Sequence, residues 1–417
     1  MDWNPRGPIA LVGTLDTKGD EVLFLKQRLA ALGVRVLVID VGVLGEPSFQ
    51  PDVTREEIAA NAGERLEGLA RERDRGRAIQ AMEAGIRVWF RSRRADIGGV
   101  LAIGGSAGTT IATAGMRELP TGVPKLMVST LASGNTRPYV GISDIAMLYP
   151  IADFTGLNRL TRSILANAAN AIAGMCGLPL PPAAEDSRAV IGATMFGVTT
   201  PCVNRLRELL EERGFEVLVF HATGTGGQAM EHLIRDGFIR GVVDITTTEL
   251  ADELVGGVLS AGPNRLEAAG HAGIPQVISV GAIDMVNWGP ADSVPQEFRG
   301  RRFYQHNPTV TLMRTTTAEN AKLGRIIAEK ANAARGPVVI LLPLRGVSAI
   351  DAENQPFYDP EADAALFGAI REHARVRVIE LYAHINDPEF AARAAAELRE
   401  MIQRSGVGTP RSTSVTS

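Results

Sequence analysis

The sequence predicts an α/β protein of two tandem Rossmann-like domains, each a doubly wound parallel sheet, with a cleft between them. Three observations support this fold class. Short apolar runs typical of buried parallel strands alternate with segments that have the apolar spacing of helices. Turns rich in glycine and hydroxyl residues follow these runs, as in open α/β sheets that bind ligands. After a proline-rich segment, the whole pattern begins again.

The composition is that of an ordinary globular protein. The chain has 417 residues, enough for two domains, and a hydrophobic content of 45%, enough for packed cores. Its 43 basic and 47 acidic side chains nearly balance, which gives no electrostatic reason to expect a nucleic-acid partner. Two cysteines cannot form a disulfide framework or a cysteine zinc cluster. Since we find neither a secretory signal pattern nor the roughly 18–20 apolar residues of a membrane span, we expect a cytoplasmic protein without a membrane partner.

The first 41 residues predict a βαβ unit. Residues 9–12 form a short apolar run, and 34–41 form a second run rich in β-branched residues. Between them, leucines recur at helical spacing, Asp20 and Glu21 lie in the acidic first turn, and Gly33 follows the end. This order of strand, helix and strand is the repeating unit of a parallel sheet.

Residues 54–94 predict helices with many arginines. Acidic residues interrupt these arginines, so we interpret them as solvated helix faces rather than as a nucleic-acid surface. A further helix is predicted over 158–175, capped by Asp153 or Thr155. The remaining strands of this half are predicted at residues 99–103, 124–128 and 142–148.

The segment 179–187 is the predicted linker, because it combines clustered prolines with a polar end. After it, apolar runs repeat the order of the first half, at residues 189–193, 215–220, 239–245, 276–280, 338–342 and 376–381. We therefore predict a nucleotide-binding domain over 1–183, a second Rossmann-like domain over 187–404 and a disordered tail over 405–417.

Three polar turns in the first half are predicted to form one nucleotide or phosphate site. Glycines let a ligand approach the main chain, and the amides that open the next helix favour an anion. Lys18 is placed to neutralise phosphate and Asp16 to hold magnesium or a sugar hydroxyl, although Asp16 and Thr17 are alternatively helix caps. Neither a Walker A loop nor a dinucleotide fingerprint is present. The predicted binding residues are Gly13, Thr14, Asp16, Thr17, Lys18, Gly104, Gly105, Ser106, Gly108, Thr109, Ser129, Thr130, Ser133 and Gly134.

The second half places titratable side chains at the ends of predicted strands. A histidine beside carboxylates acts as a general acid or base, or as a metal ligand. The residues that we expect to converge are His221, Asp244, Glu249, Asp284 and His384. They suggest an enzyme of small-molecule catabolism, acting on a carbonyl or carboxylate substrate at the domain cleft. The alternative is a structural hydrogen-bonded cluster with helix caps.

Other polar residues have local interpretations. Asp359 and Asp387 each precede a Pro-Glu pair, which is typical of a helix N-cap. Cys202 opens a predicted helix that would favour a thiolate, but we expect a buried packing residue. Residues 299–314 are interpreted as an arginine-rich loop leading into a helix, either closing over an anionic substrate or simply exposed.

Eight blocks of sequence resemble those of a known family, at residues 13–18, 104–109, 129–134, 195–203, 220–224, 244–249, 284–287 and 384–387. This is the Tm-one-like ATP-binding domain family, which comprises the ATP-binding domain of the tomato mosaic virus resistance protein and its bacterial relatives. The resemblance extends from about residue 9 to about residue 390. It implies two Rossmann-like subdomains, ATP bound in the first, and assembly into homodimers or higher homo-oligomers.

In the plant protein this domain inhibits viral replication and precedes a TIM-barrel domain. For this chain we expect a stand-alone, bacterial-type ATP-binding protein, with magnesium as a further candidate ligand, and we do not carry the antiviral action over. One residue departs from the family pattern: Ala107 replaces a glycine in the block Gly-Gly-Ser-Gly-Gly-Thr. Its methyl group is expected to crowd the phosphate loop slightly.

Overall fold

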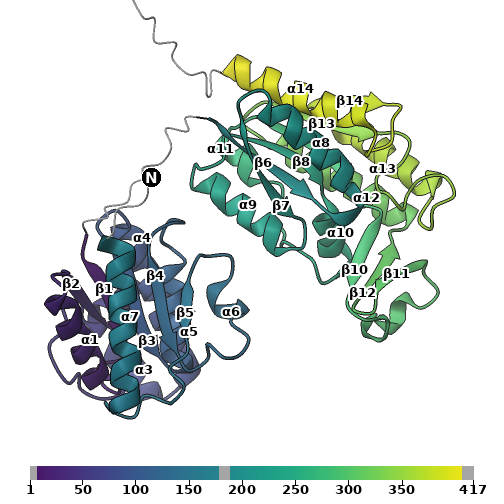
Figure 1. Ribbon diagram of the computed structural model, residues 1–417. Coiled ribbons are helices and arrows are strands. Elements are labelled where there is room, and N and C mark those ends of the chain that lie inside the picture. The colour runs from purple at the N-terminus through teal and green to yellow at the C-terminus, as the bar shows by residue number, and fades with distance from the viewer. Residues whose placement is uncertain (1–6, 178–187, 406–417) are drawn as a thin grey trace, which may run out of the picture. The chain divides into compact units, whose positions relative to one another are not determined.

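The structure is a computed structural model that describes residues 7–177 and 188–405. The chain divides into two compact units, Met1–Ala184 (unit 1) and Glu185–Ser417 (unit 2) (Figure 1). The predicted linker at 179–187 and all but the first residue of the predicted tail lie outside the described residues.

Unit 1 contains a five-stranded sheet in the order β2-β1-β3-β4-β5, and all its pairings are parallel. The strands are β1 (Ile9–Gly13), β2 (Val36–Asp40), β3 (Gly99–Gly104), β4 (Lys125–Ser129) and β5 (Ala146–Leu148). This is the flavodoxin-like order, in which the direction of winding reverses between β1 and β3. The predicted runs at 9–12, 34–41, 99–103, 124–128 and 142–148 are therefore confirmed as strands, with shorter bounds in two cases.

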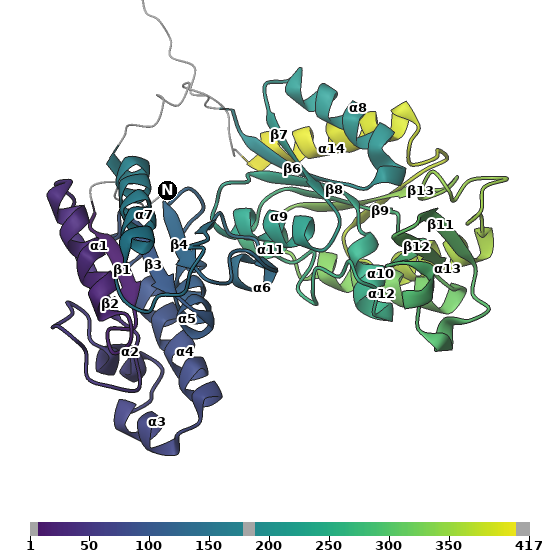
Figure 2. The same ribbon diagram turned by 60° about the horizontal axis from the view of Figure 1, so that its bottom comes forward.

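Helices cover both faces of this sheet (Figure 2). They are α1 (Gly19–Ala31), α2 (Arg55–Asn61), α3 (Leu66–Glu72), α4 (Arg75–Arg93), α5 (Ser106–Met116), α6 (Arg137–Val140) and α7 (Arg159–Gly177). Side chains of α1 and α7 share one buried core with Ile9 and Leu11. Those of α2 to α5 share the other core with Ala10 and Val12, so the strand residues alternate between the two faces.

The predicted cap of α7 is wrong in its residue. Asn158 caps this helix, because its side-chain oxygen accepts hydrogen bonds from the amides of Leu160 (2.9 Å) and Thr161 (3.0 Å). Asp153 instead accepts a bond from the amide of its own neighbour, Phe154. Asparagine is as good a cap as aspartate, and it directly precedes the helix.

Unit 2 contains a six-stranded parallel sheet in the order β14-β13-β9-β8-β6-β7. Its strands are β6 (Val190–Met195), β7 (Glu216–His221), β8 (Gly241–Thr246), β9 (Gln276–Gly281), β13 (Val338–Pro343) and β14 (Arg377–Leu381). Counted from the start of each unit, the strand order is 2-1-3-4-5 in unit 1 and 2-1-3-4-5-6 in unit 2. The predicted class of two Rossmann-like α/β domains is confirmed, while the cleft between them stays a prediction.

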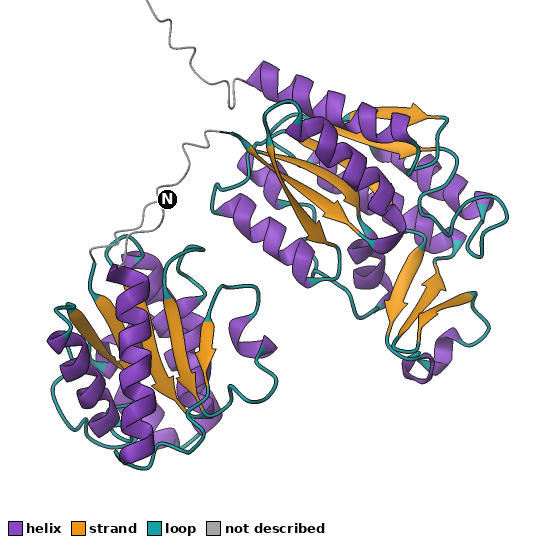
Figure 3. Ribbon diagram, viewed as in Figure 1, coloured by secondary structure: helices purple, strands orange, loops and turns teal. Residues whose placement is uncertain are grey.

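Helices again cover both faces of the sheet (Figure 3). Buried side chains of α8 and α14 form one core, and those of α10, α12 and α13 form another on the opposite face. The helices are η1 (Gly197–Thr199), α8 (Thr200–Glu211), α9 (Thr225–Arg235), α10 (Thr248–Val255), α11 (Ala268–Ala272), α12 (Thr317–Asn332), α13 (Pro360–His373) and α14 (Pro388–Ser405). No helix within 7–177 or 188–405 combines the length and apolar character that crossing a membrane requires.

A small antiparallel sheet follows β9 and was not predicted (Figure 3). Its order is β10-β12-β11, formed by β10 (Met285–Trp288), β11 (Phe303–Asn307) and β12 (Val310–Arg314), with the short turns η2 (Ala291–Ser293) and η3 (Gln296–Phe298) before β11. The interpretation of residues 299–314 as a loop leading into a helix is therefore wrong. The strand β11 is mostly exposed, so its sequence lacks the apolar alternation that marks a half-buried strand.

The local predictions in unit 2 have mixed outcomes. Asp359 is confirmed as the cap of α13, because its carboxylate accepts from the amide of Ala362 at 3.1 Å. The carboxylate of Asp387 instead accepts from the amide of His384, which closes the turn before α14. Cys202 is confirmed as a buried packing residue, and burial raises the pKa of its thiol to about 12.

Candidate functional site

A cavity of about 780 Å³ opens at the carboxyl ends of β1, β2 and β3 in unit 1. Because the winding of the sheet reverses between β1 and β3, this is the edge where open α/β sheets bind ligands. The volume lies within the range of about 300–1,000 Å³ that is usual for small-molecule sites. The lining residues are Thr14, Asp16, Thr17, Lys18, Val41, Gly42, Val43, Leu44, Leu69, Ala70, Arg73, Asp74, Arg75, Ala78, Ile79, Gly105, Ser106, Ala107, Gly108 and Ile111.

Two of the three predicted turns line this cavity. The turn after β1 contributes Thr14, Asp16, Thr17 and Lys18, and the turn after β3 contributes Gly105, Ser106 and Gly108. Gly13 and Gly104 are the last residues of their strands, directly before these turns, and Thr109 is buried one residue further along α5.

The third turn packs beside the second instead of lining the cavity. The Ser129 and Thr109 hydroxyl oxygens are 2.6 Å apart, and the Thr130 amide donates to the Gly104 carbonyl. The described lining includes none of Ser129, Thr130, Ser133 and Gly134. Ser129 and Thr130 instead support the loop before α5, and a direct role of these four residues in ligand binding stays a prediction.

The first turn of α5 presents main-chain amides to the cavity. The first intrahelical bond runs from the Thr109 amide to the Gly105 carbonyl at 2.9 Å, so the amides of residues 106–108 have no acceptor inside the helix. In the described structure no side chain caps this end. Residues 106–108 all line the cavity, and the helix dipole adds partial positive charge there. This arrangement suits an anion such as a phosphate group.

Gly104 explains how the loop comes so close to α5. A Cβ atom at this position would lie 2.8 Å from the Cα atom of Gly108, closer than real Cβ atoms approach the main chain. A Cβ atom at Gly105 would meet nothing nearer than the Thr130 hydroxyl at 3.8 Å. Ala107 lies in this first turn and is one of the residues that line the cavity.

Asp16 joins the turn after β1 to the loop after β2. Its Oδ2 atom accepts from the amides of Leu44 (2.8 Å) and Gly45 (3.3 Å). Its Oδ1 atom is buried and has no hydrogen-bond partner among the described residues. The alternative of a helix cap for Asp16 and Thr17 is wrong, because α1 begins after Lys18 with no side-chain cap, while the Thr17 and Thr14 hydroxyls bond each other at 2.7 Å.

Sequence reasoning missed two further features of this site. Asp40 ends β2, and its Oδ1 atom accepts from the amides of Leu15 (3.0 Å) and Gly42 (2.9 Å), while Oδ2 is buried without a partner among the residues described. Burial raises the pKa of Asp40, and the nearby charge of Asp16 raises it further. The other feature is the turn that carries Arg73 and Arg75, which the sequence suggested only as solvated helix surface.

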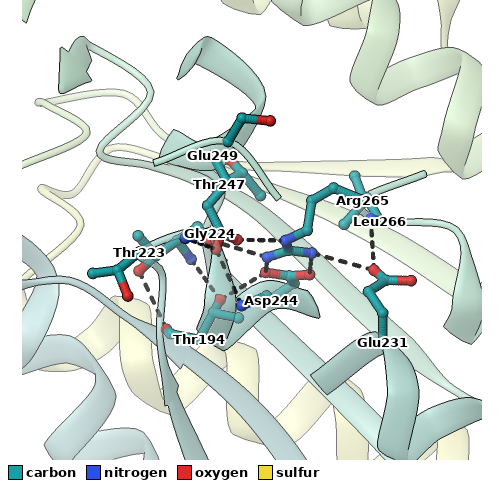
Figure 4. Close-up of polar contacts among 12 residues, drawn as sticks. Thr194, Thr223, Gly224, Glu231, Asp244, Thr247, Glu249, Arg265 and Leu266 are labelled. Atoms are coloured by element: carbon teal, nitrogen blue, oxygen red, sulfur yellow. Dashed lines mark hydrogen bonds and ion pairs between the residues drawn. The ribbon is translucent and has the colours of Figure 1, made fainter. Parts of the chain in front are cut away.

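In unit 2, Asp244 and Glu249 belong to a buried cluster around Arg265, which the sequence did not single out (Figure 4). The Arg265 guanidinium donates to both carboxylate oxygens of Asp244 at 2.6 and 2.7 Å and to Glu249 at 2.6 Å. A third acid, Glu231, lies 3.5 Å from it. Burial acts to lower the pKa of Arg265, but the charges of Asp244 and Glu249 hold it well above its usual value. Arg265 therefore stays positively charged beside these acids.

Glu249 also fixes the glycine-rich turn after β7. Its Oε1 atom accepts from the amides of Gly224 (2.7 Å) and Gly227 (3.1 Å), as Figure 4 shows for Gly224. The alternative of a structural hydrogen-bonded cluster describes these contacts, since both carboxylates are sealed from solvent. His221 stands apart at the exposed end of β7, where its ring packs on Phe196 with 5.4 Å between centroids.

Asp284 and His384 meet at Ser348, away from the Arg265 cluster. The Ser348 hydroxyl donates to Asp284 at 2.8 Å, and the His384 Nε2 atom lies 2.9 Å from the Ser348 carbonyl. The His384 Nδ1 atom accepts from the Asn386 amide, so the proton of a neutral ring is on Nε2 and is donated to that carbonyl. The five residues expected to converge are thus divided among three places. Within residues 7–177 and 188–405, no group of three or more His, Cys, Asp or Glu residues could hold a metal ion.

Asp284 also lies in a second buried cluster. Arg314 donates to Asp351 (3.3 Å) and Asp363 (2.8 Å), so one guanidinium faces several carboxyl groups. Burial, together with the charge of Asp351, raises the pKa of Asp284 to about 7 and that of Asp363 to about 8. These groups fix the small antiparallel sheet to α13.

The fold and the cavity define a two-domain α/β protein with an anion-suited site at the switch point of its first sheet. The chain belongs to the uncharacterised protein family UPF0261, since the model of the N-terminal domain of this family matches residues 7–179 and that of the C-terminal domain matches residues 188–402. This membership confirms the predicted kinship at the level of the family.

Relatives come from bacteria and a plant. A UPF0261 protein of Clostridium tetani is 51% identical over 401 residues, which cover 95% of this chain and 99% of the relative. A UPF0261 protein of Mesorhizobium japonicum is 48% identical over 394 residues, covering 94% and 98%. The ToMV resistance protein Tm-1(GCR237) of Solanum lycopersicum is 41% identical over 406 residues, which cover 91% of this chain and 54% of that protein.

Proposed function

We propose that unit 1 binds a nucleotide, ATP, in the cavity at the carboxyl ends of β1, β2 and β3. The observation that carries this proposal is the uncapped first turn of α5, which offers the amides of residues 106–108 to that cavity. A phosphate group bound there would satisfy amides that lack intrahelical acceptors and would interact favourably with the helix dipole. The family resemblance supports ATP as the nucleotide, and the proposal covers binding, not hydrolysis.

The remaining walls suit the other parts of a nucleotide. Val43, Leu44, Ile79 and Ile111 supply apolar surface for a base. Lys18 lines the cavity beside the turn after β1, where an ammonium group would favour phosphate, although its Nζ atom donates to the Phe154 carbonyl in this structure. The Oδ1 atom of Asp16, which has no partner among the described residues, is an acceptor for a sugar hydroxyl or, as the alternative, a ligand for a metal ion.

Magnesium is compatible with the same residues. This ion usually binds through one or two carboxylates together with substrate phosphates and water. Asp16 lines the cavity and has one carboxylate oxygen without a partner among the described residues, whereas Asp40 does not line the cavity and burial raises its pKa. We therefore propose that Asp16 holds Mg²⁺ when the ion accompanies the nucleotide.

Substitution of Ser106 by glutamate tests the proposal. Ser106 is exposed in the first turn of α5, where an acidic side chain favours the helix, so the variant should fold with undiminished thermal stability. The same carboxylate would repel phosphate from the cavity. We expect isothermal titration calorimetry to show ATP binding in the presence of magnesium for the unsubstituted chain and no binding for Ser106→Glu.

The matched control is Ser163→Glu. Ser163 is an exposed residue of α7 in the same unit and does not line the cavity, so this variant carries the same charge change and should bind ATP normally. Absence of ATP binding by the unsubstituted chain would refute the proposal, and so would equal binding by Ser106→Glu. Assembly into homodimers stays a separate prediction, which light scattering coupled to size-exclusion chromatography would test.

A further inference from the structure

Two arginines on the α3–α4 turn line the cavity and have no partner in the described structure. Arg73 and Arg75 are exposed, and neither makes an ion pair or a hydrogen bond with a side chain of residues 7–177 or 188–405. Nearby arginines behave differently. Arg77 pairs with Glu64 (3.0 Å) and Glu72 (2.8 Å), and Arg87 pairs with Glu118 (3.1 Å).

The acid between these two arginines is already engaged. Asp74 caps α4, because its carboxylate accepts from the Arg77 amide at 3.1 Å. The turn therefore brings two uncompensated guanidinium groups to the cavity wall while its one carboxylate serves the helix. A guanidinium presents a planar set of donors that matches a phosphate group in a bidentate way.

The main chain at Arg73 has a conformation that glycine adopts more readily. Arg73 ends α3 with φ 54° and ψ 19°, in the left-handed region. Other helices of this chain end in that region with glycine, as α10 does at Gly256 and α11 at Gly273. A non-glycine residue there is held at some cost, and such costs concentrate at functional sites. The side chain that replaces glycine is one that reaches the cavity.

We propose that Arg73 and Arg75 bind a second anionic group of the ligand, distinct from the phosphate on the first amides of α5. Two anion-binding walls on one cavity select a ligand with two or more phosphates, so nucleoside di- and triphosphates bind and monophosphates bind weakly. This inference rests on the proposed function, because it assigns the phosphate-number selectivity of the same site. The arginines determine this specificity by contact with the ligand.

The double variant Arg73→Ala/Arg75→Ala tests the inference by calorimetry with ATP, ADP and AMP in the presence of magnesium. Loss of charge-assisted hydrogen bonds should raise the Kd for ATP and ADP about ten- to a hundredfold and change that for AMP much less. The matched control is Arg71→Ala/Arg94→Ala. It removes the same charge from two exposed arginines of unit 1 that do not line the cavity, so its affinity for ATP should stay that of the unsubstituted chain.

The single variant Arg73→Gly separates binding from folding. Glycine suits the left-handed conformation, so this variant should melt at the same or a higher temperature than the unsubstituted chain while it binds ATP more weakly. A merely structural role of the side chain would lower the melting temperature instead. That result would overturn the inference.

The remaining outcomes distinguish the inference from the proposed function. If the unsubstituted chain binds ATP and the Arg73→Ala/Arg75→Ala variant binds it equally well, the inference is overturned and the proposed function stands. An equal loss in the Arg71→Ala/Arg94→Ala control would assign the effect to long-range charge and overturn the inference too. If the unsubstituted chain binds no nucleotide, both fail together.

Discussion

Replacing Arg265 by methionine tests whether Asp244 and Glu249 hold unit 2 together or act on a substrate. The Arg265 guanidinium is fully buried and makes two bonds to Asp244, at 2.6 and 2.7 Å, and one to Glu249, at 2.6 Å. Methionine has a similar length but no charge. The variant would therefore leave these two carboxylates and Glu231 buried without their cation.

The expected loss of stability is large. Removing one partner of a buried ion pair costs about 3–5 kcal/mol, because the other partner keeps its desolvation penalty. Three carboxylates share this one cation, so we expect a value at the upper end of that range, against a total of roughly 5–15 kcal/mol for a domain. Hydrogen exchange read by mass spectrometry measures the effect: amides of β8 should lose protection, while those of β3 in unit 1 should keep theirs.

The loss should also depend on pH. Burial raises the pKa of Glu231, and Arg265 opposes that rise, so the pKa rises further in the variant. A carboxyl group with a raised pKa in the folded state binds its proton more tightly there than in the unfolded chain. The protein therefore loses stability as the pH rises above 4.5, the ordinary pKa of a glutamate side chain. The destabilisation should therefore be larger at pH 8 than at pH 5.

The control is Arg235→Met on α9, an exposed site where a substitution should change stability by no more than about 0.5 kcal/mol. A cost of less than about 1 kcal/mol for Arg265→Met, well below the range for a broken buried pair, would show that this cluster does not stabilise unit 2. An equal cost at both pH values would show that Glu231 does not titrate as expected.

Three further predictions concern local packing and titration. Gly104→Ala should destabilise unit 1 by about 1–3 kcal/mol in urea unfolding, because its Cβ atom would lie 2.8 Å from the Gly108 Cα atom. The control Gly105→Ala should leave the stability unchanged, since the nearest atom to its Cβ would be 3.8 Å away. Equal effects of the two substitutions would show that the close contact at Gly104 does not limit stability. Burial raises the pKa of Asp363 to about 8 from a usual 3.8, so between pH 5 and 8 the folded state holds a proton that the unfolded chain releases. Asp363→Asn should therefore flatten the decline in the stability of unit 2 over this range by about 1.4 kcal/mol per pH unit in urea unfolding. An unchanged profile would show that the carboxyl group is not protonated. Burial raises the pKa of the Cys176 thiol to about 11 and that of the Cys202 thiol to about 12. Mass spectrometry should therefore show that iodoacetamide at pH 8 modifies neither thiol in the folded protein and both thiols in urea. Rapid labelling of Cys202 in the folded protein would instead support a thiolate at this helix N-terminus.

The sheets were predictable because buried parallel strands are continuous apolar runs. Residues 99–103 and 124–128 became β3 and β4 because every residue of both strands is buried. The strand β11 was not predictable in this way, since its residues are largely exposed and its pairing with β12 is set by a hairpin. Periodicity detects burial, and an exposed strand lacks that signal.

The site was predictable only where its residues directly follow strands. The turns after β1 and β3 were found because each begins where an apolar run ends. Asp40 was missed because it completes such a run; its Oδ1 atom accepts from amides of neighbouring turns, while Oδ2 has no partner among the described residues. Arg73 and Arg75 were missed because their place depends on how α3 and α4 pack against the sheet, which no local spacing reports.

The two units make different use of the same strand order. In unit 2, the corner between the first and third strands is closed by its own polar groups: the Thr199 and Thr246 hydroxyls bond each other at 2.8 Å, and Thr194 donates to Asp244 at 2.6 Å. In unit 1, the corresponding corner places on a cavity main-chain amides and two arginines that have no partner among the described residues. A polar group already paired within the protein offers a ligand little, because binding would have to break that bond first. This contrast supports a ligand site in unit 1 and a stabilising role for the equivalent corner of unit 2.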